Sequence, residues 1–301
     1  MVGMQVWPEL PFAAWRDTHA TLHLWLQIVG KIRLAQMPWL NHSWHVSLYV
    51  SSRGLTTLAI PHGERFFQID LDFIDHRLQV HSSDGASSAM ALAPQPVARF
   101  YGELMTLLAK AGLPVAIRAA PNELEHAIPF PEDRVHRAYD AEYAQRFWRI
   151  VLQSSRVLER FRARFRGKSS PVHFFWGNSD LALTRFSGRR APEHPGGRPH
   201  LPDRVLKDAY SHECYECGFW PGNEENPEPV FYALAYPEPD GFKQMKVLPA
   251  AAYYSAQLKE FVLPYEAVRP AESPDAVLLE FLQATYEAAA TLGGWDRSTL
   301  E

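Results

Sequence analysis

The hydrophobic pattern of this sequence passes from helical to strand-like and back to helical, and it does so twice along the chain. In residues 22–32 apolar side chains recur at steps of three and four, as in an amphipathic helix that Asp17 or Thr18 would cap. Residues 66–74 instead alternate apolar and polar side chains, which predicts a strand with one covered face. A second helical pattern at 97–111 ends at Gly112, a favourable C-terminal cap.

The same order recurs after a proline-rich connector at residues 113–139. The patterns predict helices at 140–166 and from about 273 to 292, strands at 172–176, 181–186, 230–236 and 260–264, and an irregular Pro/Gly-rich insertion at 188–222. We therefore predict an α+β fold by internal duplication. Its two similar halves, residues 1–125 and 126–301, would pack as one unit about a pseudo-twofold axis, with a shared cleft between them.

Composition limits the class of protein. The chain has 301 residues, 47% hydrophobic residues and a formal charge of −4, which is typical of a globular protein and argues against a nucleic-acid binder that needs a clustered basic surface. The first residues lack the pattern of a secretory signal, and no apolar run is long enough to cross a bilayer. We expect a cytoplasmic protein that binds a small molecule and neither nucleic acid nor membrane.

Residues 171–222 gather histidines, acidic residues, tryptophans and both cysteines, and are the predicted location of a functional site. One interpretation is a thiolate metal site formed by His212, Cys214 and Cys217, because soft sulfur ligands beside an imidazole suit zinc. The alternative is that the two cysteines are reduced and pack as small hydrophobic residues.

A second interpretation uses histidines without cysteine. If the halves pair as predicted, His45 and His173 occupy matching corners, and His42, His212 and Glu213 could converge with them. Imidazoles with one carboxylate suit a single zinc, iron or copper ion. The simpler alternative is that each histidine hydrogen-bonds to nearby backbone.

A third interpretation needs no metal. His173 or His212 would act as a general base beside Glu213 or Asp180. No pattern of phosphate-cradling glycines occurs, so no nucleotide cofactor is expected.

Five further residues are candidates for substrate binding. Arg185 and Arg189 could orient an anionic group by paired donors, and Trp44, Trp176 and Trp220 could stack on a flat substrate. The alternative for the aromatic residues is a place in the hydrophobic core.

Several motifs together resemble an uncharacterised bacterial family, domain of unknown function 5996. They are Trp7–Leu10, Thr21–Lys31, Asn41–Val46, Ser170–Gly177, Thr184–Arg189, Tyr210–Glu213 and Gly218–Trp220 with the following Pro221-Gly222. The resemblance covers nearly the whole chain and implies a soluble, single-unit protein, but no activity. It also implies that Cys214 and Cys217 are peripheral, and that the four histidines and Glu213 of the second interpretation are the transferable part of the site.

The sequence thus predicts a small-molecule enzyme with a histidine-rich site between two halves. The enzyme would be either metal-dependent, with zinc, iron or copper, or a metal-free acid–base catalyst that uses histidine and glutamate. The alternative class is a non-catalytic module that binds a small molecule or a protein through an aromatic groove.

Overall fold

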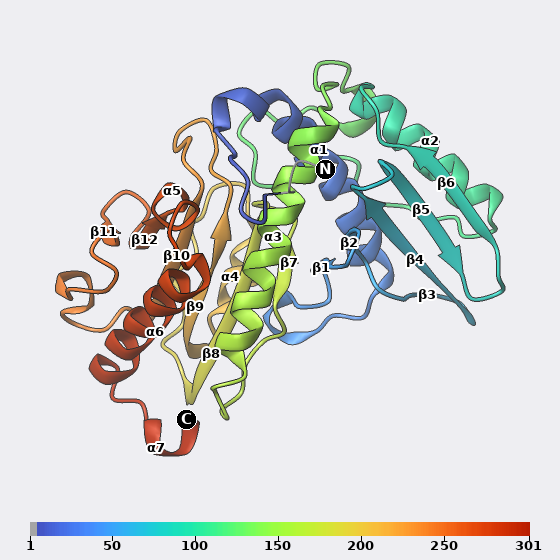
Figure 1. Ribbon diagram of the computed structural model, residues 1–301. Helices are drawn as coiled ribbons and strands as arrows, with labels where there is room; N and C mark the ends of the chain where they lie inside the picture. Colours follow the sequence, from blue (N-terminus) through green and yellow to red (C-terminus); the bar gives the residue numbers. More distant parts are fainter. Residues whose placement is uncertain (1–4) are drawn as a thin grey trace.

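Two antiparallel six-stranded sheets organise residues 5–301, the part of the chain that the computed structural model describes (Figure 1). The first sheet has the order β1-β2-β4-β5-β6, and β3 pairs separately with β4. Its strands are β1 (Tyr49–Val50), β2 (Gly54–Thr56), β3 (Ile60–His62), β4 (Arg65–Asp72), β5 (Arg77–Ser82) and β6 (Ser87–Ala91). The alternation predicted at residues 66–74 corresponds to β4, whose Phe67, Ile69 and Leu71 are buried.

The second sheet has the order β11-β12-β10-β9-β8-β7. Its strands are β7 (His173–Phe175), β8 (Asp180–Arg190), β9 (His212–Trp220), β10 (Val230–Tyr236), β11 (Tyr253–Ser255) and β12 (Glu260–Pro264). Antiparallel sheets with segregated helices confirm the predicted α+β class. The sheets differ in strand order, and the pseudo-twofold relation between the halves stays a prediction.

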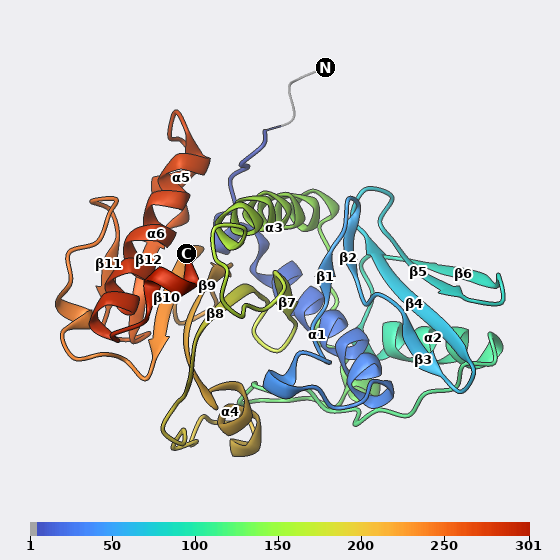
Figure 2. The ribbon, with the colours of Figure 1, turned by 90° about the horizontal axis from the view of Figure 1, so that it is seen from below.

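Two long helices, α1 (Phe12–Gln36) and α3 (Ala141–Arg162), lie between the sheets, as Figures 1 and 2 show. Helix α2 (Val97–Lys110) packs on α1, and α6 (Pro274–Leu292) packs on α3 and the second sheet. The short helices are α4 (Asp203–Ala209), α5 (Tyr265–Val268) and α7 (Arg297–Leu300), with 3-10 turns η1 (Asn41–Ser43), η2 (Phe130–Glu132) and η3 (Phe242–Gln244). One hydrophobic cluster includes residues of both sheets. Within residues 5–301, no helix combines the length and the apolar character needed to cross a membrane.

Helix α1 begins earlier than the capping pattern predicts. It starts at Phe12, directly after Pro11, and neither Asp17 nor Thr18 caps it. The extra turn is stabilised by tertiary packing, because Trp15 is buried and its ring lies 5.2 Å from that of Phe147 on α3.

The prediction of an irregular insertion at 188–222 is wrong for most of that segment. Strand β8 continues to Arg190, α4 follows, and β9 lies between β8 and β10 inside the sheet. Within it, residues 191–202 form the longest stretch without a helix or a strand, and the prolines and glycines cluster there and just after Trp220. Strand β9 was missed because it carries large or polar side chains on both faces, so it shows no apolar–polar alternation.

The two faces of the second sheet differ sharply in chemistry. Leu183, Tyr215, Phe219 and Phe231 lie on one face, which packs against α3 and α6. The register pairs Thr184 with Glu216 and Gly218 with Tyr232, which places these residues on the opposite face. Asp180 on β8 and Glu260 on β12 share this second face by the same alternation of side chains. The sheet therefore supports a core on one side and presents carboxyl groups on the other.

Candidate functional site

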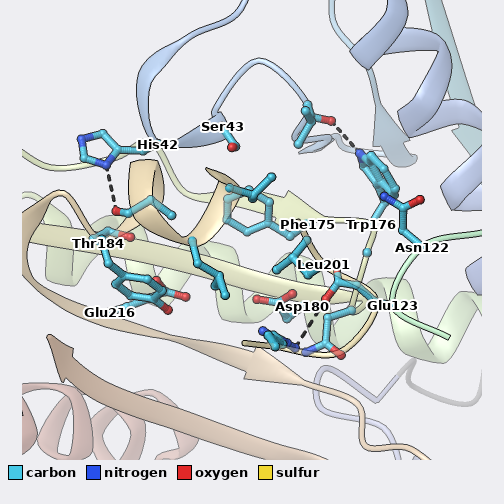
Figure 3. A pocket seen from close by; sticks show the side chains of 18 of the residues that line it. His42, Ser43, Asn122, Glu123, Phe175, Trp176, Asp180, Thr184, Leu201 and Glu216 are labelled. Carbon is cyan, nitrogen blue, oxygen red and sulfur yellow. Dashed lines mark hydrogen bonds and ion pairs between the residues drawn. The ribbon is translucent and has the colours of Figure 1, made fainter. Parts of the chain in front are cut away.

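A cavity of about 570 Å³ lies between the acidic face of the second sheet and the N-terminal half of the chain (Figure 3). The sheet contributes Asp180, Thr184, Glu216, Trp220, Tyr232 and Glu260. The N-terminal half contributes Trp39, His42, Ser43, Trp44, Asn122 and Glu123. This volume is in the range of small-molecule sites in proteins.

Residues 191–209, here called the covering segment, form a third wall. Arg198, Leu201, Val205 and Leu206 of this segment line the cavity. The segment is held by polar contacts to the N-terminal half. The His42 ring donates from Nδ1 to the Ala209 carbonyl at 2.9 Å, the Trp39 indole donates to Asp208 at 3.2 Å, and Arg198 lies 3.4 Å from Glu123.

Three carboxyl groups on the floor of the cavity have pKa values near neutrality. Burial raises the pKa of Asp180 to about 6, that of Glu216 to about 7 and that of Glu260 to about 8. Charge repulsion within the cluster adds to burial for both glutamates, because each ionised carboxylate disfavours ionisation of its neighbours. At neutral pH the floor therefore holds ionised and protonated carboxyl groups side by side.

The Tyr232 hydroxyl connects two of these groups. It donates to Asp180 at 2.9 Å and lies 3.5 Å from a carboxylate oxygen of Glu216. The space for this hydroxyl depends on Gly218, where a Cβ atom would lie 2.8 Å from the tyrosine oxygen and would also collide with the Leu181 carbonyl. Asp180 has the lowest pKa of the three groups, and the hydrogen bond from Tyr232 favours its charged form.

Ser43 lines the cavity in an uncommon backbone conformation. Both His42 and Ser43 have a φ of 59°, in the left-handed region that residues other than glycine rarely adopt. Ser43 is only 6% exposed, and its hydroxyl has no hydrogen-bond partner among the residues described. Strained backbone of this kind costs on the order of 1–3 kcal/mol and clusters at ligand sites.

Trp176 forms a fixed part of the aromatic wall. Its indole nitrogen donates to the Val46 carbonyl at 2.8 Å, and its ring lies where a side chain at position 30 would be, so Gly30 is required for its placement. Lys31 lies 5.8 Å from the centre of the same ring and donates to Asn122 at 2.7 Å. Burial lowers the pKa of this amine to about 8.

Several residues that the sequence singles out line this cavity. They are His42, Trp44, Trp176, Asp180 and Trp220. Their roles in catalysis, substrate binding or metal binding stay predictions, but the structure brings them to one place.

The other predicted histidines lie apart from the cavity lining. His45 is buried, accepts from the Leu40 backbone amide at 3.2 Å and packs 4.6 Å from the Trp39 ring. His173 is fully buried behind Trp44, with ring centres 6.1 Å apart, and neither ring nitrogen has a partner within residues 5–301. Burial lowers the pKa of His173 to about 3, so its ring is neutral at physiological pH.

His212 and Glu213 lie at the beginning of β9. The His212 ring centre is 5.8 Å from that of His42, and its Nδ1 contacts the Ser211 hydroxyl at 3.1 Å. Glu213 accepts from the Ser187 hydroxyl and from Arg189, each at 2.8 Å.

The two predicted substrate-binding arginines also lie outside the cavity lining. Arg185 is buried on the core face of β8, where its guanidinium lies 3.4 Å from the centre of the Phe161 ring. Arg189 binds Glu213 and the carbonyl of Gly294.

The predicted metal ligands do not form one cluster in this structure. In the described part of the chain, no three His, Cys, Asp or Glu side chains are grouped so that they could hold one metal ion. Cys214 and Cys217 are free and buried, and burial raises the pKa of both thiols, that of Cys217 to about 12. Metal binding by His42, His45, His173, His212 and Glu213 therefore stays a prediction.

Sequence reasoning missed the most acidic part of the cavity. Glu123, Glu216, Glu260, Tyr232 and Ser43 were not singled out. Glu216, Gly218 and Trp220 are spaced by two, as residues on one face of a strand are, and this spacing was the available signal.

The fold and the cavity define an α+β protein with an acidic, partly aromatic pocket between its second sheet and the N-terminal part of the chain. The model of a family of unknown function, DUF5996, matches residues 7–301, and the chain belongs to this family. No curated protein matches the chain, and no solved structure matches it either.

Proposed function

We propose that the chain is an enzyme that performs acid–base chemistry on a small molecule bound in the acidic cavity. The observation that carries this proposal is the group formed by Asp180, Tyr232 and Glu216, in which one hydroxyl lies between two carboxyl groups with pKa values of about 6 and about 7. General acid–base catalysis is most effective when the catalytic pKa lies near the working pH.

The geometry suggests a division of roles. Asp180 is the general base, because the Tyr232 hydroxyl stabilises its ionised form. Glu216 is the general acid, because burial and the neighbouring carboxylate keep its proton in place near pH 7. One proton leaves the substrate for Asp180 and one reaches it from Glu216, and transfer through the Tyr232 hydroxyl restores the starting state.

Conversion of a metabolite mixture tests this proposal. The wild-type protein would be incubated with a mixture of small metabolites, followed by mass spectrometry, beside Asp180→Asn and Glu216→Gln. Glu125→Gln is the matched control, because Glu125 is exposed and outside the cavity lining. We expect at least one compound to be consumed by the wild-type and control proteins but not by the two cavity variants. Conversion that is unchanged in both variants would show that the assigned groups are wrong.

A non-catalytic binding module is the second candidate. The aromatic wall formed by Trp44, Trp176 and Trp220, together with the covering segment, supports it. In the same experiment, compounds that are retained by the protein but converted by none of the proteins would favour this candidate.

A histidine-bound metal is a separate proposal at the edge of the same cavity. His42 lines it and His212 lies beside His42. Metal analysis of protein purified without an affinity tag tests it, with His42→Ala and His212→Ala as variants. Bound zinc, iron or copper that both variants lose would support a histidine site, and metal retained by both would contradict it.

A further inference from the structure

We propose that the ligand of the acidic cavity carries a protonated amine, which Asp180 and Glu216 bind directly. This inference rests on the proposed function for the identity of the site, and it adds the class of substrate. Three observations carry it: the charges of the cavity lining, the Ser43 hydroxyl, which has no hydrogen-bond partner within residues 5–301, and the aromatic walls.

Acidic groups outnumber basic groups in the cavity lining. Five carboxyl side chains face two guanidinium groups there. Both guanidinium groups already have partners, because Arg198 is paired with Glu123 at 3.4 Å and Arg204 lies 5.3 Å from the centre of the Trp39 ring. The carboxyl groups are Glu123, Asp180, Glu216, Glu225 and Glu260. An anionic ligand would be repelled by the ionised Asp180 and would oppose ionisation of Glu216, whereas an ammonium group would pair with both.

Ser43 independently indicates a polar ligand. Its hydroxyl is buried in the lining with no partner in residues 5–301, although buried hydroxyl groups normally make a hydrogen bond. The backbone of Ser43 is held at a φ of 59°. Figure 3 shows Ser43 on the N-terminal segment, away from Asp180 on the sheet, so a bound molecule would lie between the two walls.

The aromatic side chains suit the body of such a ligand. Trp44 and Trp176 line the cavity together with Phe175, Trp220 and Tyr232 from strands of the second sheet. Aromatic faces attract cations and stack on flat groups, and a cavity of about 570 Å³ has room for an amine that carries a ring.

Binding of a cation has a second consequence, the release of protons. An ammonium group next to Glu216 favours the ionised form of this carboxyl group. The protonated fraction of Glu216 near pH 7 therefore falls on binding, and protons are released. The groups that face Glu216 and share this effect come from several elements. They are Asp180 of β8, Tyr232 of β10, Glu260 of β12, Arg198 of the covering segment, and Tyr210, which directly follows that segment.

Three probes that differ only in charge test the inference. Benzylamine, benzyl alcohol and benzoate carry the same ring with a cationic, a neutral and an anionic substituent. We expect benzylamine to bind roughly tenfold or more tightly than benzyl alcohol, as for a hydrogen bond to a charged group, and benzoate to bind least. Calorimetry in two buffers of different ionisation enthalpy would show proton release for benzylamine only.

Variants assign the effect to the cavity floor. Asp180→Asn and Glu216→Gln should each remove most of the preference for benzylamine, whereas Glu125→Gln outside the lining should retain it. Two substitutions are used so that a folding defect in one, detected by circular dichroism, leaves the other to decide.

The outcomes separate this inference from the proposed function. Equal binding of benzylamine and benzyl alcohol, tighter binding of benzoate, or no binding of any probe by the wild-type protein would each overturn the amine inference, and the conversion experiment would still decide catalysis. A preference for benzylamine without conversion of any compound would support the amine site and contradict the proposal that the protein is an enzyme.

Discussion

The Tyr232 hydroxyl on β10 donates a hydrogen bond of 2.9 Å to Asp180 on β8 of the second sheet. Strand β9 lies between β8 and β10, so the tyrosine side chain must reach over it. Gly218 on β9 leaves the space that this reach requires. The hydrogen bond between Tyr232 on β10 and Asp180 on β8 therefore depends on Gly218 on β9.

Replacement of Tyr232 by phenylalanine should raise the pKa of Asp180 further above about 6, because the hydrogen bond favours the ionised carboxylate. Carboxyl carbon NMR during a pH titration measures this directly. Tyr210→Phe is the control, because Tyr210 lines the same cavity but makes no hydrogen bond to Asp180. A lower pKa of Asp180 in Tyr232→Phe would contradict the role assigned to the hydroxyl.

Glu216 should make the folded protein less stable as pH rises. The folded chain keeps a proton on Glu216 up to about pH 7, whereas the unfolded chain releases it near its ordinary value of 4.5. The folded state therefore binds more protons in this window, and the free energy of unfolding falls as pH rises through it. Relative to Glu216→Gln, the wild-type protein should lose on the order of 1 kcal/mol or more between about pH 5 and about pH 7.5. Urea unfolding at both pH values measures the difference, and Glu125→Gln should show no such trend.

Gly218→Ala should destabilise the protein and displace Tyr232. Its Cβ would collide with the Leu181 carbonyl and lie 2.8 Å from the tyrosine oxygen, so a cost of roughly 1–3 kcal/mol or more is expected. Gly102→Ala is a matched comparison, because Gly102 lies within α2 with open space around it and alanine favours helix by about 0.5–1 kcal/mol. Thermal unfolding of both variants would show opposite signs. Equal stability of the two would contradict the packing argument.

Ser43→Gly should increase stability and weaken ligand binding. Glycine adopts a φ of 59° without strain, and the substitution also removes the unpartnered hydroxyl. We expect a gain of about 1 kcal/mol in the free energy of unfolding. Ser179→Gly is the control, because Ser179 is buried at a φ of 58° but does not line the cavity. It should show a similar gain without a change in binding of the cavity's ligand.

Cys214 and Cys217 should be unreactive in the folded protein. Both are buried and burial raises the pKa of both thiols, so little thiolate is present at neutral pH. Iodoacetamide at about pH 8 should modify neither residue in the native protein and both in urea. Rapid native modification, measured by mass spectrometry, would favour the thiolate interpretation instead.

Elements with clear periodicity could be predicted from the sequence. Strand β4 and helix α2 each bury one regular stripe of side chains, so their patterns are visible without tertiary information. Strand β9 could not be predicted in this way, because Tyr215 and Phe219 face the core while Glu216 and Trp220 face the cavity. Burial on both faces removes the contrast on which the pattern depends.

The candidate site was predictable in location more than in chemistry. Asp180, Trp44 and Trp176 could be singled out because histidines, acidic residues and tryptophans gather near them in the sequence. Glu216 and Glu260 gain their properties from burial next to each other, although they are 44 residues apart in the sequence and their strands are separated by β10 in the sheet. The proximity of these two side chains depends on strand pairing, which a single sequence does not specify.

The alternation of side chains along β9 also limits how this chain can diverge. Insertion of one residue between Cys214 and Tyr215 would turn Tyr215 toward the cavity and Glu216 toward α3 and α6. Such a change would bury a carboxylate in an apolar core and remove one from the ligand wall at the same time. Length changes are therefore far more tolerable in residues 191–202, which have no strand partner to misalign.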